Sequence, residues 1–217
     1  LEALNARKPL LLSDEAACRE NRPRALVDAF RESGMEMGVV AALPAEVRPD
    51  LVHQLAAIYR DKDCDALLVM GAGPLADLSK WLNLVVSTGQ DDLERLAGDA
   101  GGGIPLNPTV WIAPAAATGY EASGRAQFGQ TVARLIGLMP DLVAIDARTV
   151  GAPEASAVIE AGLAALTIGA EGLLERGGQN PMVQIYATNA VQMAAAGLAT
   201  ADQLPEAVDP RLRIANA

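Results

Sequence analysis

Residues 69–80 read Val69-Met70-Gly71-Ala72-Gly73-Pro74-Leu75-Ala76-Asp77-Leu78-Ser79-Lys80. The apolar residues at the start predict a buried strand, the glycines predict a tight turn, and the residues after them predict a helix. Free backbone N–H groups and the positive end of the helix dipole would meet at this turn, an arrangement that binds phosphate. The pattern therefore predicts a nucleotide site, although a Gly-x-Gly turn also occurs in many strand-to-helix connections that bind nothing.

Strands and helices alternate around this turn. The hydrophobic pattern predicts strands at residues 8–12, 35–40, 65–70, 109–113 and 142–146, and helices at 22–33, 50–62 and from 75 onward. Short connections between alternating strands and helices are typical of βαβ units. We therefore expect a parallel sheet covered by helices on both faces, with its ligand edge at the carboxyl ends of the strands.

The pattern changes near residue 150. From Pro153 onward only helices are predicted, at 153–175 and 180–196, with a last piece from Asp209. We expect an α/β nucleotide-binding domain over residues 1–150 and the start of an all-helical domain over 151–217. The chain begins at Leu1 rather than Met and ends without a helix C-cap signal, so we expect it to be part of a longer protein.

Composition narrows the class of partner. The 217 residues are 51% hydrophobic and 20% charged, enough apolar residue to bury a core. The formal net charge is −10 and the pI is about 4.6, which argues against nucleic acid and anionic membranes as main partners, because both need clustered Lys and Arg.

Location is predicted from the thiols and the apolar runs. Cys18 and Cys64 have neither metal-ligand spacing nor the pattern of a secreted disulfide framework, so a reducing cytoplasm is expected. The longest apolar run, residues 155–174, is interrupted by Glu160 and Glu171, which predicts a buried helix rather than a membrane span.

A second small-residue turn follows the first, with Thr118, Gly119, Tyr120 and Glu121 at its end. Met139-Pro140-Asp141-Leu142 precedes a predicted strand, and Asn180-Pro181 precedes a predicted helix. In this order, the motifs resemble the iron-containing alcohol dehydrogenase family over most of the chain, which corresponds to roughly the first half of such an enzyme. The resemblance implies a dehydroquinate synthase-like fold, with NAD or NADP and a divalent metal bound between a nucleotide-binding domain and a helical domain.

The resemblance implies cofactor contacts at both turns. The family motif Gly-Gly-Gly-Ser-x-x-Asp-x-x-Lys falls on Gly71, Ala72, Gly73, Pro74, Asp77 and Lys80, and the second turn retains Thr118, Gly119 and Glu121 of the family pattern. Pro74 lacks the N–H and the hydroxyl of the family serine, which predicts weakened cofactor affinity. After the second predicted strand the chain has Ala41-Ala42-Leu43, so an acid that would contact the ribose is not expected there.

The metal ligands implied by the resemblance are missing. The family's Asp and His, four residues apart on one helix face, fall on Ala164 and Ile168. Alkyl side chains offer no lone pair to a cation. The chain has one histidine, His53, which we interpret as a surface or packing residue, so no metal is expected.

Three functions stay open from the sequence. The first is a degenerate member of the family that keeps the fold and a nucleotide pocket, with weak or absent activity. The second is a working oxidoreductase acting on a small alcohol or aldehyde, with Lys80, Tyr120 or Glu121 transferring protons. The third is a structural or regulatory subunit that pairs with an active relative through Ala- and Leu-rich helices, in a homo- or hetero-oligomer.

Overall fold

A computed structural model of the chain describes residues 1–19, 21–44, 46–71, 73–99, 103, 105–112, 123–144, 155–174 and 180–199. Contacts divide the chain into two units. The first unit comprises Leu1–Ile112 with Tyr120–Ala144, and the second comprises Ala113–Gly119 with Ile145–Ala217.

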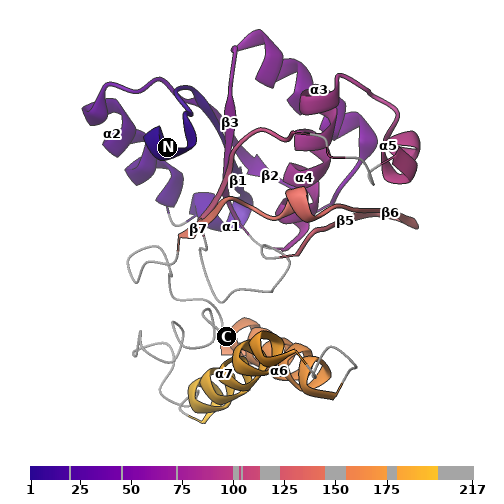
Figure 1. Cartoon of the computed structure of the whole chain (residues 1–217). Helices are drawn as coiled ribbons and strands as arrows, with labels where there is room; N and C mark the ends of the chain where they lie inside the picture. The colour runs from indigo at the N-terminus through magenta and orange to yellow at the C-terminus, as the bar shows by residue number, and fades with distance from the viewer. Residues whose placement is uncertain are drawn as a thin grey trace. The chain divides into compact units, whose positions relative to one another are not determined.

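The first unit is built on the predicted parallel sheet (Figure 1). Its five strands lie in the order β2-β1-β3-β4-β7, with bounds β1 Pro9–Asp14, β2 Gly38–Leu43, β3 Ala66–Met70, β4 Thr109–Ile112 and β7 Leu142–Ala144. The chain passes from β1 to β2 on one side and then to β3 on the other, so the strand order reverses between β1 and β3. Open α/β sheets bind ligands at the carboxyl ends of the strands beside such a reversal.

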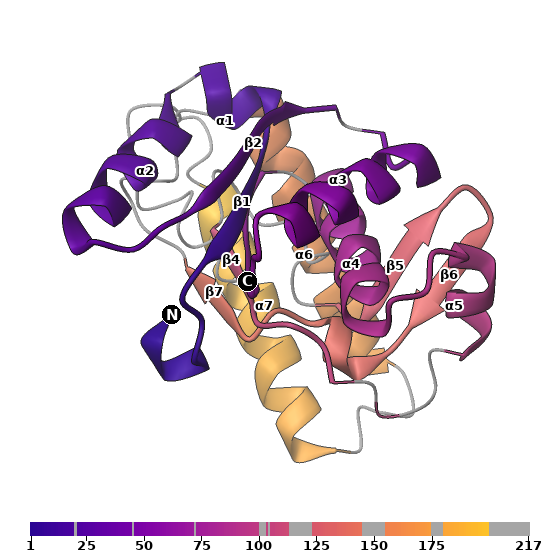
Figure 2. The same ribbon diagram turned by 90° about the horizontal axis from the view of Figure 1, so that it is seen from above.

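Helices cover both faces of the sheet. The helices of the first unit are α1 Glu15–Arg19, α2 Arg22–Ser33, α3 Pro49–Asp61, α4 Gly73–Thr88 and α5 Leu93–Asp99, of which α5 packs against β6, and short 3₁₀ turns lie at Glu2–Leu4 and Ile136–Leu138. Figure 2 shows α1 and α2 on one side of the sheet and α3 and α4 on the other. Because both faces are covered, β1 and β3 are nearly continuous apolar runs.

The core on the α2 side follows from the alternation of side chains along the strands. Leu11 of β1, Leu68 and Met70 of β3, and Val110 and Ile112 of β4 form one buried cluster. Partly buried side chains of α2 pack against it, namely Leu26, Val27 and Phe30.

Several predicted boundaries differ from the structure. Helix α2 lies at the predicted residues, but β2 begins at Gly38 rather than Met35, because Gly34 ends α2 in the left-handed region and a short extended link follows. The short helices α1 and α5 were not predicted. Nor was the antiparallel hairpin of β5 (Arg125–Phe128) and β6 (Thr131–Arg134), which turns at Gly129.

The second unit contains two helices that pack against each other, α6 (Ala155–Leu174) and α7 (Pro181–Leu198). Glycines on α6 allow close approach: a Cβ at Gly162 would lie 2.7 Å from Leu198, and one at Gly169 would lie 2.7 Å from Val191. Asn180 caps α7 by accepting the Met182 N–H at 3.0 Å. The predicted piece from Asp209 lies outside the described residues. No helix in the described part of the chain is long and apolar enough to cross a membrane.

Candidate functional site

The glycine turn lies where the sequence predicts it, between β3 and α4. Strand β3 ends at Met70, Gly71 follows, and α4 begins at Gly73, while Ala72 lies outside the described residues. The first N–H groups of this 16-residue helix have no partner within the helix and, with the helix dipole, favour an anion. The turn therefore has the arrangement expected of a phosphate site.

Asp14 lies beside this turn and was missed in the sequence. Strands β1 and β3 are neighbours, with Ser13 opposite Met70, so Asp14 and Gly71 follow paired residues at the same edge of the sheet. A Cβ on Gly71 would lie 2.6 Å from the Asp14 Oδ2 atom and 2.6 Å from a methyl carbon of Leu75. Only a glycine fits between these neighbours without displacing them.

The Asp14 carboxylate also begins α1. Its Oδ1 atom accepts the Ala17 N–H at 2.8 Å, which fixes the half-buried carboxylate at the end of β1. Nucleotide-binding folds often place such an acid after the second strand, but β2 ends in Ala41, Ala42 and Leu43. The signal at β1 was a polar Ser13-Asp14 pair directly after an apolar run.

Asp77 and Lys80 both lie on α4, and both contact the β5–β6 hairpin. Lys80 is 5% exposed, and its Nζ donates to the Ser123 carbonyl at 2.7 Å, the Arg125 carbonyl at 3.0 Å and the Ser123 Oγ at 3.2 Å. The Asp77 Oδ1 atom accepts the Gln127 N–H at 3.0 Å. Burial raises the pKa of Asp77, while the Gln127 N–H and the charges of Lys80 and Arg125 oppose that shift.

The end of the second predicted turn lies outside the described residues, namely Thr118, Gly119, Tyr120 and Glu121. The strand before them, β4, ends at Ile112 opposite Met70 of β3. Their predicted role in cofactor binding stays a prediction.

A family model described as iron-containing alcohol dehydrogenase matches residues 1–147. The chain belongs to the iron-containing alcohol dehydrogenase family. It is 26% identical over 175 residues to the 4-hydroxybutyrate dehydrogenase of Cupriavidus necator, which covers 76% of this chain and 44% of the relative. It is 22% identical over 199 residues to the NAD-dependent methanol dehydrogenase of Bacillus methanolicus, which covers 89% of this chain and 52% of the relative.

Solved structures of alcohol dehydrogenase-type proteins have the same fold as this chain. A 1,3-propanediol oxidoreductase superposes with a TM-score of 0.87 at 22% identity, over 99% of this chain and 57% of its own. The sulfoacetaldehyde reductase of Bifidobacterium kashiwanohense in complex with NAD+ superposes with a TM-score of 0.85 at 19% identity, over 99% of this chain and 58% of its own. The chain thus spans about half the length of these relatives.

The resemblance places the family's first two metal ligands on α6. The residues at these positions are Ala164 and Ile168, and the Ile168 side chain is 56% exposed. Neither side chain can donate an electron pair, so these two residues do not fit a divalent metal. Within the described residues, no group of three or more His, Cys, Asp or Glu side chains could hold an ion.

His53 contacts a backbone carbonyl in the described part of the chain. It lies on α3, and its Nε2 atom is 2.7 Å from the Asp91 carbonyl oxygen, which ties the helix to the segment before α5. This contact agrees with its interpretation as a surface or packing residue.

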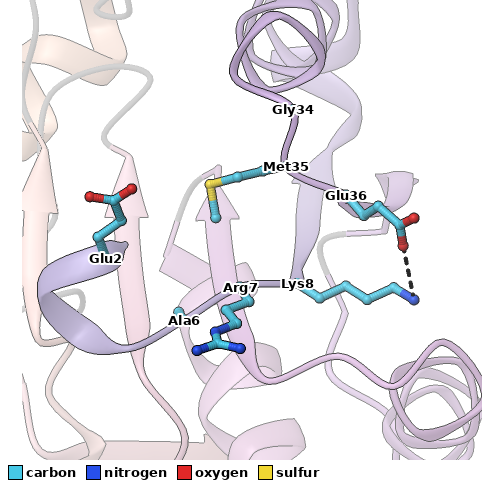
Figure 3. A pocket seen from close by; sticks show the side chains of 7 residues that line it. All are labelled: Glu2, Ala6, Arg7, Lys8, Gly34, Met35 and Glu36. Carbon is cyan, nitrogen blue, oxygen red and sulfur yellow. Dashed lines mark ion pairs between the residues drawn. The ribbon is translucent and has the colours of Figure 1, made fainter.

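A cavity of about 480 Å³ lies away from the glycine turn (Figure 3). It is lined by residues 6–8 and 34–36, which precede β1 and β2, together with Glu2. Lys8 and Glu36 form an ion pair of 3.3 Å there. Residues that precede parallel strands lie at the amino edge of the sheet, whereas Asp14 and Gly71 lie at its carboxyl edge, so this cavity is not the predicted nucleotide site.

Proposed function

We propose that this chain is the nucleotide-binding part of an alcohol dehydrogenase-like protein that binds NAD without a metal. The observation that carries the proposal is the Gly71 turn at the N-terminus of α4, beside the Asp14 carboxylate and at the reversal of strand order. The helix N-terminus suits a diphosphate, and the carboxylate suits a ribose hydroxyl. The NAD-dependent relative from Bacillus methanolicus supports this choice of cofactor.

Asp14 favours NAD over NADP in this proposal. A carboxylate accepts hydrogen bonds from a ribose 2′-hydroxyl, but it repels the 2′-phosphate of NADP. Pro74, the second residue of α4, offers no N–H to the phosphate, so we expect the affinity to be lower than a serine at this position would give.

Alcohol oxidation is proposed to be weak or absent. A divalent metal would polarise the alcohol oxygen of a small alcohol or aldehyde substrate, and Ala164 and Ile168 cannot help to hold one. In this proposal the described residues bind the cofactor, with a helix N-terminus for the diphosphate and the Asp14 carboxylate for the ribose. We therefore expect metal-assisted hydride transfer to be lost.

NADH fluorescence titration, with NADPH in parallel, tests the binding proposal. We expect saturable NADH binding that is unaffected by EDTA, and weaker NADPH binding. Absorbance assays with small alcohols and added Fe²⁺ or Zn²⁺ test the catalytic proposal, with no metal-dependent formation of NADH expected. Metal-dependent turnover would contradict it.

A structural or regulatory subunit is the second candidate. The second unit exposes large apolar side chains on both helices, among them Leu163 and Ile168 on α6 and Ile185 and Tyr186 on α7. Exposed apolar surface of this kind is typical of interfaces. A complex with a full-length relative, detected by analytical ultracentrifugation of the mixture, would support this function. Two proteins that sediment separately would argue against it.

A further inference from the structure

Helix α4 carries a polar stripe on an otherwise buried surface. Asp77, Lys80, Asn83 and Ser87 are separated by three, three and four residues, a spacing that places them along one face of the helix. Lys80 and Asn83 are each 5% exposed. Buried polar groups are retained at a desolvation cost, so their partners indicate what they do.

The carboxyl-terminal half of the stripe holds the segment that enters β4. Asn83 Nδ2 donates to the Asn107 carbonyl at 2.8 Å and to the Thr109 Oγ1 at 2.9 Å. The Asn83 Oδ1 atom accepts the Asn107 N–H at 3.0 Å, and Ser87 Oγ accepts the Asn107 Nδ2 at 2.9 Å. These two α4 side chains therefore fix the start of one strand.

The amino-terminal half holds the hairpin instead. The ammonium group of Lys80 has three N–H donors, and three oxygen atoms of Ser123 and Arg125 lie within 2.7–3.2 Å of it. The carboxylate of Asp77 accepts the Gln127 N–H two residues further along β5. The edge-to-face contact between Trp81 of α4 and Phe128 of β5, with ring centroids 5.2 Å apart, extends the same interface.

We propose that Asp77 and Lys80 are positioning residues that clamp the β5–β6 hairpin onto α4, rather than direct ligands of a cofactor diphosphate. Lys80 would have to give up hydrogen bonds to carbonyl oxygens to reach a phosphate. The Asp-x-x-Lys spacing places the two side chains about one helical turn apart on α4. From there Lys80 binds Ser123 and Arg125, and Asp77 binds Gln127. That Lys80 does not contact a diphosphate rests on the proposed function, whereas the clamp rests only on the contacts of α4 with the hairpin.

Amide hydrogen exchange tests the clamp in the full chain. Lys80→Met keeps an unbranched apolar stem and removes the ammonium, and we expect exchange of the Gln127 amide and its hairpin neighbours to accelerate by about tenfold or more. Lys62→Met, at an exposed lysine after α3, removes the same charge and should leave hairpin exchange unchanged. Unchanged hairpin exchange in Lys80→Met would overturn the clamp.

Two variants of Asp77 test the clamp in case Lys80→Met does not fold. Asp77→Asn keeps an oxygen acceptor for the Gln127 N–H, whereas Asp77→Ala removes it. We expect faster hairpin exchange in Asp77→Ala than in Asp77→Asn, and equal exchange in the two variants would count against the clamp.

ADP, which carries a diphosphate, separates positioning from direct contact. The proposed diphosphate site is at the N-terminus of α4 and the preceding turn, whereas the Lys80 ammonium is bound to Ser123 and Arg125. Lys80→Met should therefore change the Kd for ADP by less than about threefold, which is less than the loss of a charged hydrogen bond would cause. A loss of tenfold or more with normal hairpin exchange would instead assign Lys80 to the diphosphate. If wild-type protein does not bind ADP, the proposed function fails, while the exchange result still decides the clamp.

Discussion

At the scale of single residues, the position of the Asp14 carboxylate explains why residue 71 is a glycine. The carboxylate at the end of β1 occupies the space where a Cβ on residue 71 would lie, so any other residue there must displace it. The sequence predicted Gly71 from the turn pattern. It did not predict Asp14, because the pairing of β1 with β3 is a property of sheet order and leaves no local pattern.

Gly71→Ala should damage both folding and binding. The new Cβ would lie 2.6 Å from Asp14 Oδ2, and the resulting displacement should lower the free energy of unfolding by about 1–3 kcal/mol. Urea unfolding measures the stability, and calorimetry with NADH measures the affinity. Gly98→Ala in α5 is the matched control, because a Cβ there meets nothing within 4 Å, and its stability should be unchanged or raised by up to about 1 kcal/mol. Equal effects at the two glycines would contradict the steric argument.

Asp14→Asn should reduce the preference for NAD over NADP. The amide keeps an oxygen near the Ala17 N–H but no longer carries the charge that repels a 2′-phosphate. We expect the ratio of NADPH to NADH dissociation constants to fall by about tenfold, the effect of one charge contact of about 1.4 kcal/mol. Asp61→Asn, at the exposed end of α3, should leave the ratio unchanged. A ratio unaffected by Asp14→Asn would remove Asp14 from the cofactor site.

At the scale of elements, strands and helices with long apolar patterns could be predicted from the sequence, whereas short strands of mixed polarity could not. The runs in β1 and β3 and the amphipathic pattern of α2 and α3 identify these elements to within a residue or two at most ends. The hairpin strands have four residues each and mix polar with apolar side chains, so only Gly129 marked them. The contacts of Lys80 could not be predicted either, because its partners lie 43 and 45 residues away along the chain.

The α4–hairpin interface predicts a pH dependence. Asp77 has a pKa raised above its ordinary 3.8, chiefly by burial. Between pH 3.8 and the raised pKa the folded state binds more protons than the unfolded state, so this group's contribution to the free energy of unfolding falls as pH rises. Asn cannot titrate, and the stability of wild-type protein relative to Asp77→Asn should therefore decline with pH through that window. Urea unfolding of both proteins at several pH values from 3.5 to 7 measures this difference, and a difference that grows with pH would refute the argument.

At the scale of the whole molecule, the two units carry different parts of the proposed function. The first unit carries the glycine turn and Asp14, while the second carries Ala164 and Ile168, where the resemblance places two of the family's metal ligands. The fold class could be predicted from the order of strands and helices, and family membership over residues 1–147 bears out the resemblance. We therefore propose that nucleotide binding is independent of the metal-ligand positions, because a fold and its site chemistry depend on different residues.

Calorimetric titration of the chain with NADH in EDTA, repeated after addition of Fe²⁺, tests the central claim most directly. We predict saturable binding with one site per chain and the same Kd in both titrations. No binding in either titration, or binding that requires Fe²⁺, would contradict a metal-independent nucleotide site at the ends of β1 and β3.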